Sequence, residues 1–292
     1  MPLTDRPWLI AVLLGMLALS PAQAGMTPEE VKSFDFYRAR ADKGESVAQF
    51  ILGYYYESGK GVDMDDVQAA FWYRKAAEQG HAAAQAFFGV CCAHGSGVLK
   101  DEVMAVSWYR KAAMQNDAVG QFCLGLAYAQ ALGVRKDEAE AVKWYRKAAE
   151  QGFVNAQTYL GLAYSKGRGL SQNDVEAVKW FRKAADQGDL KALAMLGNAY
   201  NVGRGVTANQ VEAYAYLLLS RNLDQETLEN FPYIEGRMSP EGKLRGTQRA
   251  HELQKEIDTK KEALLKAKTA ARLKPGEAEQ KAAELKRTQK GA

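Results

Sequence analysis

The hexapeptide "WYRKAA" occupies residues 72–77, 108–113 and 144–149, and "WFRKAA" occupies residues 180–185. Each copy starts 36 residues after the one before, with an aromatic residue, Tyr216, at the next step. A fixed period of this length indicates a stacked array of identical helical units. The five repeats that the period defines are residues 45–80, 81–116, 117–152, 153–188 and 189–224.

Each repeat begins with apolar residues three and four positions apart, as in "AQFILGYYYESG" at 48–59, which is helical spacing. A second helix is predicted to start at an aspartate or asparagine, and four of the five repeats carry glutamine or glutamate three residues later, as in a capping box. The predicted N-caps are Asp65, Asp101, Asp137, Asn173 and Asn209. The second helix is predicted to end near Gly80, Asn116, Gly152 and Gly188.

The first helix of every repeat contains a glycine: Gly53, Gly89, Gly125, Gly161 and Gly197. Glycine inside a helix costs about 0.5–1 kcal/mol relative to alanine, so a close contact must compensate. We predict that the tryptophan of each hexapeptide, such as Trp72, packs against this glycine. The basic pair, Arg74 and Lys75 in the first repeat, lies near the end of a helix, and we interpret it as structural, with ligand binding as the alternative.

The N-terminal residues 1–24 resemble a secretory signal peptide. Arg6 precedes an apolar run from Trp8 to Leu19, and Ala22 and Ala24 follow at the spacing that signal peptidase accepts. The run is shorter than the roughly 20 residues that a membrane-spanning helix needs. Cleavage after Ala24 is therefore expected, and the mature chain is expected in the periplasm or secreted, without a transmembrane span.

Residues 25–44 form a half repeat, because Phe36 and Tyr37 precede Trp72 and Tyr73 by 36 residues. Beyond the fifth repeat, residues 225–258 are expected to cap the array, as an irregular link followed by a helix that starts at Ser239. The buried side of this helix is predicted to consist of Leu244, Leu253 and Ile257.

Residues 259–292 are expected to be a basic tail, either helical or disordered. From residue 255 to the end, 11 lysines and arginines face 6 acidic residues, a balance of 11 − 6 = +5. Such a tail can contact an anionic surface. We expect no nucleic-acid binding, because no aromatic residue follows Tyr233 to stack on bases.

The repeat pattern, A-Q-x-x-L-G-x-x-Y early and W-Y-R-K-A-A-E-Q-G late, resembles that of the Sel-one-like repeat family, relatives of the tetratricopeptide repeats. The resemblance covers about residues 33–219 and implies an α-solenoid of antiparallel helix pairs, wound as a right-handed superhelix. It also implies an exported bacterial scaffold that binds a peptide or protein on its concave face, in envelope regulation, envelope assembly or host contact. In this family the first helix of each repeat generally faces inward.

If the first helices face inward, the side opposite the glycines forms the binding surface. We predict that seven of its residues contact the partner: Phe50, Tyr54, Val90, Phe122, Leu126, Leu162 and Asn198. Ala86, Thr158 and Ala194 share this face. The alternative is that some of these side chains belong to the core, since apolar stripes on helices are usually buried.

An enzymatic function is the main alternative, because cysteine-rich exported relatives have been associated with β-lactam binding and hydrolysis. The S-x-x-K and K-T-G motifs of serine β-lactamases are absent from the sequence, so we predict no catalytic residues and no cofactor. Cys91 and His94 can share a helical face, but a zinc site normally shows a second paired motif, and we predict no metal. A disulfide from Cys123 to Cys91 or Cys92 is a candidate, because neighbouring repeats present these positions about one helical turn apart.

Overall fold

The computed structural model describes residues 27–221 and 231–272, and every regular element within these ranges is an α-helix, as predicted. The predicted signal peptide, the cleavage site after Ala24 and residues 273–292 of the predicted tail lie outside the described residues. The helices are α2 (Pro28–Asp42), α3 (Ser46–Ser58), α4 (Asp66–Glu78), α5 (Ala82–His94), α6 (Glu102–Met114), α7 (Ala118–Gln130), α8 (Glu138–Glu150), α9 (Val154–Lys166), α10 (Asp174–Ala185), α11 (Leu190–Val202), α12 (Gln210–Leu219), α13 (Phe231–Arg237) and α14 (Pro240–Arg272).

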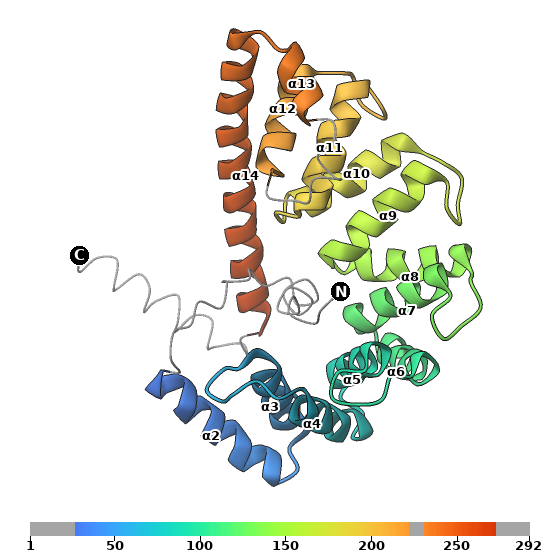
Figure 1. Ribbon diagram of the computed structural model, residues 1–292, viewed down its shortest axis with the longest axis vertical. Helices are drawn as coiled ribbons and strands as arrows, with labels where there is room; N and C mark the ends of the chain where they lie inside the picture. The colour runs from blue at the N-terminus through green and yellow to red at the C-terminus, as the bar shows by residue number, and fades with distance from the viewer. Residues whose placement is uncertain (1–26, 222–230, 273–292) are drawn as a thin grey trace. The chain divides into compact units, whose positions relative to one another are not determined.

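The chain forms two compact units, one ending at Trp180 and the other beginning at Phe181. In the first unit α3 packs against α4, α5 against α6 and α7 against α8, and each second helix also contacts the first helix of the next repeat. Figure 1 shows α5 and α7 on the inner side of this unit, with α6 and α8 on its outer side. The first helices of successive repeats therefore share one face and the second helices share the other.

The second helices begin at the predicted N-caps, but the predicted capping boxes are only half formed. The Asp65 carboxylate accepts a hydrogen bond from the N–H of Gln68 at 2.9 Å, and no reciprocal bond from the Gln68 side chain accompanies it. The N–H of Asp65 instead donates to the carbonyl of Tyr56 in the preceding helix at 2.9 Å. The N–H of Asp137 donates to Tyr128 in the same way, at 3.0 Å. The second helix is therefore joined to the first helix of its own repeat at this point.

The first helices end on a residue in the left-handed conformation. Gly59 occupies this position in the first repeat with φ 69°, and Ala131 occupies it in the third with φ 60°. The second glycine of the turn has a further role, because a Cβ at Gly97 would lie 2.0 Å from the carbonyl oxygen of Asp66 in the preceding repeat. The glycine-rich turn is therefore a point of backbone contact between repeats.

The predicted contact between helix glycines and tryptophans is wrong, and the neighbouring tyrosine takes that place. A Cβ at Gly53 would lie 2.6 Å from Cδ1 of Tyr73, and one at Gly125 would lie 2.7 Å from Cδ1 of Tyr145. Adjacent residues of a helix point about 100° apart, so only one of Trp72 and Tyr73 can face the glycine. The spacing identified the correct turn of the helix but not the correct side chain.

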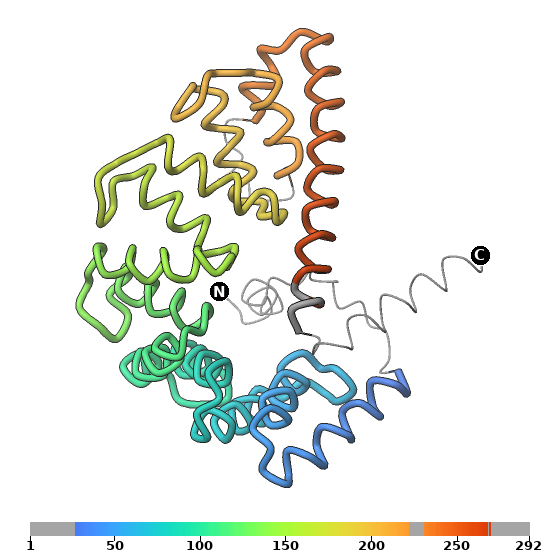
Figure 2. The backbone as a smooth tube through the Cα atoms, turned by 180° about the vertical axis from the view of Figure 1, so that it is seen from behind, coloured from blue at the N-terminus to red at the C-terminus, as the bar shows by residue number. Residues whose placement is uncertain are grey.

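The second unit is closed by α14, which packs along α12 (Figure 2). This helix is capped by Ser239 as predicted, since the Ser239 hydroxyl accepts a hydrogen bond from the N–H of Gly242 at 3.1 Å. Leu253 and Ile257 are buried, as predicted. The prediction for Leu244 is wrong, because its side chain is 59% exposed.

Gly246, and not Leu244, faces α12 at this contact. A Cβ at Gly246 would lie 2.5 Å from Cδ1 of Tyr214, so α14 approaches α12 too closely there for a large side chain. The segment before α14 also differs from the prediction, because Phe231–Arg237 forms the short helix α13 where an irregular link was expected. α14 itself continues to Arg272 and crosses the predicted boundary at residue 258.

Candidate protein-interaction site

Within the hexapeptide, the lysine side chain lies over the tryptophan ring. The Nζ of Lys111 lies 3.8 Å from the ring centroid of Trp108, three residues earlier on the same helix. Lys147 lies in the same way over Trp144, at 4.2 Å. Such cation–π contacts are worth about 0.5–1 kcal/mol at exposed sites. The lysine therefore covers the ring of the tryptophan.

The arginine of the hexapeptide connects neighbouring repeats. Arg146 donates a hydrogen bond from Nη2 to the hydroxyl of Tyr164 in the next repeat, at 2.8 Å. In the first repeat the corresponding partner would be Cys92, which cannot accept such a bond well, and Arg74 pairs instead with Glu78 at 2.7 Å. These contacts support the structural interpretation of the basic pairs.

Buried glutamines form a second connection that the sequence analysis missed. The side chain of Gln121 donates to the carbonyl of Ala113 in the preceding repeat at 3.4 Å, and its own Oε1 accepts from Gln151 at 2.7 Å. Gln85 makes the corresponding pair of contacts with Ala77 and Gln115. The signal was present in the sequence, because "AQ" or "GQ" stands near the start of the first helix in four repeats and a glutamine follows the second helix in the same four.

The predicted binding residues lie in two rows that differ in depth. Phe122 is only 4% exposed and packs against Tyr145, and Phe50 is half-buried and stacks on His81. These two rings therefore contribute to contacts within and between repeats. The other row is partly accessible in every repeat and consists of Tyr54, Val90, Leu126, Leu162 and Asn198.

Other accessible side chains extend this second row along each first helix. In α3 this row continues through Val47, Ile51, Tyr54 and Ser58, which are three and four positions apart and at least partly accessible. In α9 the corresponding residues are Asn155, Tyr159, Leu162 and Lys166. The face is therefore mostly apolar in the first repeat and becomes more polar by the fourth. We call it the first-helix face.

The first repeat contains an acidic residue at a position that holds alanine in the second and third repeats. The carboxylate of Glu57 accepts a hydrogen bond from the hydroxyl of the fully buried Tyr73. Burial raises the pKa of Glu57 to about 7, the Tyr73 hydrogen bond opposes this shift, and the negative charge of Asp66 adds to it. The structure therefore gives the first repeat a carboxyl group that titrates near neutral pH.

All three cysteines are buried and free in the structure. Burial raises the pKa of Cys92 to about 11 and that of Cys123 to about 12, which keeps both thiols protonated at neutral pH. The candidate disulfide remains a prediction. Among the described residues, no three histidine, cysteine, aspartate or glutamate side chains gather closely enough to hold a metal ion.

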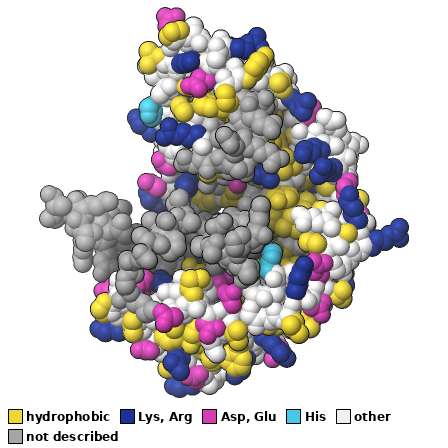
Figure 3. Space-filling view, in the orientation of Figure 1, with side chains coloured by type: hydrophobic (Ala, Val, Ile, Leu, Met, Phe, Trp, Pro, Cys, Tyr) yellow, Lys and Arg dark blue, Asp and Glu magenta, His cyan; other side chains and the backbone are white. Residues whose placement is uncertain are grey.

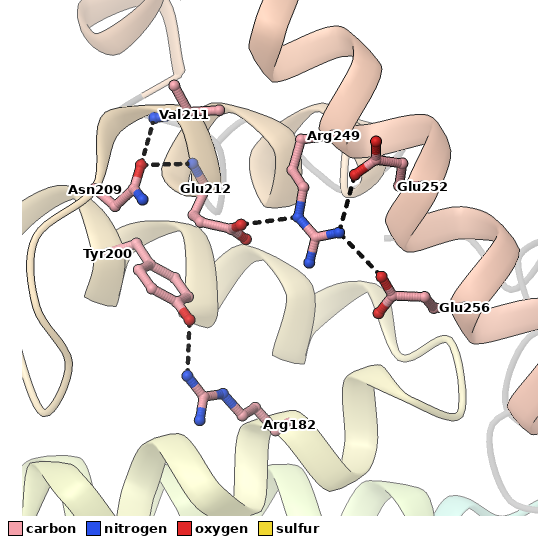
Figure 4. A network of polar contacts seen from close by, with 8 residues as sticks. All are labelled: Arg182, Tyr200, Asn209, Val211, Glu212, Arg249, Glu252 and Glu256. Atoms are coloured by element: carbon pink, nitrogen blue, oxygen red, sulfur yellow. Dashed lines mark hydrogen bonds and ion pairs between the residues drawn. The ribbon is translucent and has the colours of Figure 1, made fainter.

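The second unit contains an open pocket of about 580 Å³ between α11, α12 and α14. Figure 4 shows two polar contacts at its walls: Arg182 donates to the hydroxyl of Tyr200 at 2.7 Å, and Arg249 donates to Glu212 at 2.8 Å. Arg249 also contacts Glu252 and Glu256, at 3.2 and 3.0 Å. Three carboxylates therefore compensate the charge of Arg249, which ties α14 to α12 as a cap.

Three comparisons relate the chain to known proteins. A model of the Sel1 repeat matches residues 46–81, 82–117, 118–153, 154–189 and 190–224. A Sel1 repeat protein from Oxalobacter formigenes is 34% identical, with a TM-score of 0.62, over 66% of this chain and 78% of that one. A protective antigen present in uropathogenic Escherichia coli strains, with an SLR fold, is 27% identical, with a TM-score of 0.53, over 81% of this chain and 59% of that one. A search of curated proteins found no match.

None of the described helices is both long and apolar enough to span a bilayer. The five matched segments begin one residue after the repeats that the hexapeptide period defines and together cover more than half of the sequence. The chain belongs to the Sel1 repeat family.

Proposed function

We propose that this protein is an exported scaffold that binds a peptide or protein partner on its first-helix face. Sel1 repeats are protein-interaction modules, so a binding function follows from the family. The observation that carries the finer proposal is the row of Tyr54, Val90, Leu126 and Leu162. One partly accessible side chain per repeat recurs along this row, while the residues on either side of it enter the core.

The arrangement of the row suits a partner that runs across several repeats. Stacked helix pairs present one side chain from each repeat at regular intervals, and an extended or helical peptide can contact them in sequence. Tyr54 supplies a large ring with a polar tip, of the kind enriched at interfaces. The apolar first repeats are expected to contribute more binding energy than Asn198 at the far end.

The proposed setting is outside the bacterial cytoplasm. The predicted signal peptide supports export, and likeness to a protective antigen of uropathogenic Escherichia coli supports a role in host contact. Envelope regulation remains the alternative. β-Lactam hydrolysis is not favoured by any observation, and turnover of the chromogenic substrate nitrocefin by the purified protein would revive it.

The test is affinity capture from an envelope extract with wild-type protein and the variants Tyr54→Asp and Leu126→Asp. We expect both variants to lose the captured partner while their circular dichroism and thermal unfolding match the wild type. Met114→Asp is the matched control, because Met114 is 78% exposed at the end of α6, outside the first-helix face. Retained capture in both variants, or loss of helicity in them, would refute a binding role for this row.

A further inference from the structure

A second exposed surface lies in the first unit, where α4 and α6 begin. Its most accessible side chains are large and apolar: Leu99 is 93% exposed, Val103 69% and Val67 61%. Figure 3 shows hydrophobic, acidic and basic side chains interspersed over the region where Figure 1 places α3 and α4. We call this surface the acidic edge, and its apolar residues are Met64, Val67, Phe71, Leu99, Val103 and Met104.

The part of the acidic edge on α4, around Val67, is contiguous with the part around Leu99 and the start of α6. The turn before α6 packs on the start of α4, since a Cβ at Gly97 would lie 2.8 Å from the Cα of Val67. Leu99 follows this turn by two residues, and Val103 lies in the first turn of α6. Val67 and Phe71 are four residues apart on α4 and so share a face. The apolar side chains of two repeats therefore form one surface.

The fold does not require apolar residues at the positions of Leu99 and Phe71. The position of Leu99 is held by Arg135 in the third repeat and Ser171 in the fourth. The position of Phe71 is held by Lys143 and Lys179 in the same two repeats. Because the same structural positions accept polar or charged residues in other repeats, the apolar character of Leu99 in the second repeat and of Phe71 in the first needs another explanation. Clustered exposed apolar side chains usually mark an interaction surface.

The charge of the acidic edge indicates what it binds. Residues 60–71 carry one basic and three acidic residues, and residues 96–107 carry one and two, so the sum is (1 − 3) + (1 − 2) = −3. Residues 132–143 and 168–179, at the corresponding places, are each balanced at 3 − 3 = 0 and 2 − 2 = 0. The edge is therefore both apolar and negative only in the first two repeats, which suits a basic segment with apolar side chains.

The chain itself contains a segment of this kind. α14 buries its last side chain at Ile257, Lys260 still pairs with Asp186 of the same unit at 2.7 Å, and the helix continues to Arg272. Over residues 258–272 it carries five basic and two acidic residues, a balance of 5 − 2 = +3. Leu264 and Leu265 are 38% and 67% exposed within this stretch. The end of α14 therefore matches the acidic edge in both charge and apolar character.

We propose that the protein self-associates head to tail, with the end of α14 of one copy docked on the acidic edge of a second copy. The two contact surfaces are different parts of the chain, so the interface is heterologous and can extend to a ring or a filament. Leu264 and Leu265 supply the apolar contact. The lysines of α14 beyond Lys260 meet the aspartates around Leu99, which makes the association sensitive to salt.

The test is sedimentation velocity on the purified full-length protein, with two double variants. Leu99→Glu/Val103→Glu alters only the acidic edge, and Leu264→Glu/Leu265→Glu alters only α14. We expect wild type to show a mass above the monomer that rises with concentration and falls with added salt, and each double variant to be monomeric. Val175→Glu is the matched control, because Val175 occupies the position of Val67 and Val103 in the fourth repeat and is 53% exposed.

The decisive measurement is a mixture of the two monomeric variants. Each retains one intact half of the interface, so the mixture should form a one-to-one complex, whereas neither variant associates alone. Circular dichroism of each variant checks that it is folded. A wild type that stays monomeric at all concentrations, variants that keep its mass, or a mixture that stays monomeric would each overturn the proposal and point to a different basic partner for the edge.

Discussion

The hydroxyl of Tyr73 donates a hydrogen bond to the carboxylate of Glu57, and both side chains lie in the junction between α3 and α4. Tyr73 is also the ring that packs against Gly53. A single tyrosine therefore closes the helix pair of the first repeat and contacts the partly buried carboxyl group of Glu57. The corresponding tyrosines, Tyr109 and Tyr145, close the next two pairs against Gly89 and Gly125.

Glu57 should make stability depend on pH in a direction opposite to that of most carboxylates. Its folded-state pKa is about 7 and its ordinary value is 4.5, so the folded chain holds a proton that the unfolded chain releases. The contribution of Glu57 to stability is complete below pH 4.5 and is lost as the pH rises through about 7, by about 3 kcal/mol at most. Urea unfolding from pH 4.5 to 8 should show this loss in wild type and a flatter profile in Glu57→Gln. Glu150→Gln, at an exposed position, is the control, and an unchanged slope in Glu57→Gln would contradict the assignment.

Gly125→Ala should destabilise the protein by about 1–3 kcal/mol, although alanine favours helices more than glycine does. The new methyl group would lie 2.7 Å from the ring of Tyr145 and 3.2 Å from the carbonyl oxygen of Ala141, so the helix pair must move apart. Thermal unfolding measures the effect. Gly236→Ala is the control, because a Cβ at that helical position meets no atom within 4 Å. Equal stability of the two variants would mean that the helix pairs adjust freely.

Gln121→Ala should cost about 1–3 kcal/mol, because it removes three hydrogen bonds made by a buried side chain. The carbonyl of Ala113 and the side chain of Gln151 both lose a hydrogen bond to Gln121. Chemical denaturation with circular dichroism detection should reveal the change. Gln130→Ala, at an exposed position of the same helix, should leave the free energy of unfolding nearly unchanged. A small effect in Gln121→Ala would indicate that water replaces the lost contacts.

Ala131→Gly should stabilise the protein by about 1 kcal/mol, because an alanine is strained in the left-handed conformation and a glycine is not. Ala131 has φ 60° at the end of α7, where the other first helices of the five repeats end on glycine. The melting temperature should rise in this variant and fall in Ala129→Gly, which places glycine inside the same helix. A fall in both would show that the methyl group of Ala131 makes a compensating contact.

The thiols should react slowly in the native protein. All three are buried, and their raised pKa values leave little thiolate at neutral pH. Titration with a chromogenic disulfide reagent should detect three thiols after unfolding without reductant and almost none before. A count of one after unfolding would instead establish the candidate disulfide between Cys123 and Cys91 or Cys92.

The sequence by itself determined the repeat, the helix pairs and their ends. A period of 36 residues, glycines and asparagine at left-handed positions, and aspartates or asparagines at N-caps all act within a few neighbouring residues, so local physical chemistry was sufficient to predict them. The same local reasoning failed for Trp72 and Leu244. Which side of a helix meets its neighbour depends on the packing of two helices, and the sequence spacing of one helix does not contain that information.

Only the tertiary structure decided which apolar residues of the predicted binding face are accessible. Phe122 and Leu126 are one helical turn apart and look equivalent in the sequence, yet the first is buried against the next repeat and the second stays partly exposed. The glutamine contacts between repeats and the acidic edge likewise arise between segments that belong to different repeats. Their physical reason is stacking: each repeat completes the environment of its neighbour, and that environment exists only once the repeats are packed.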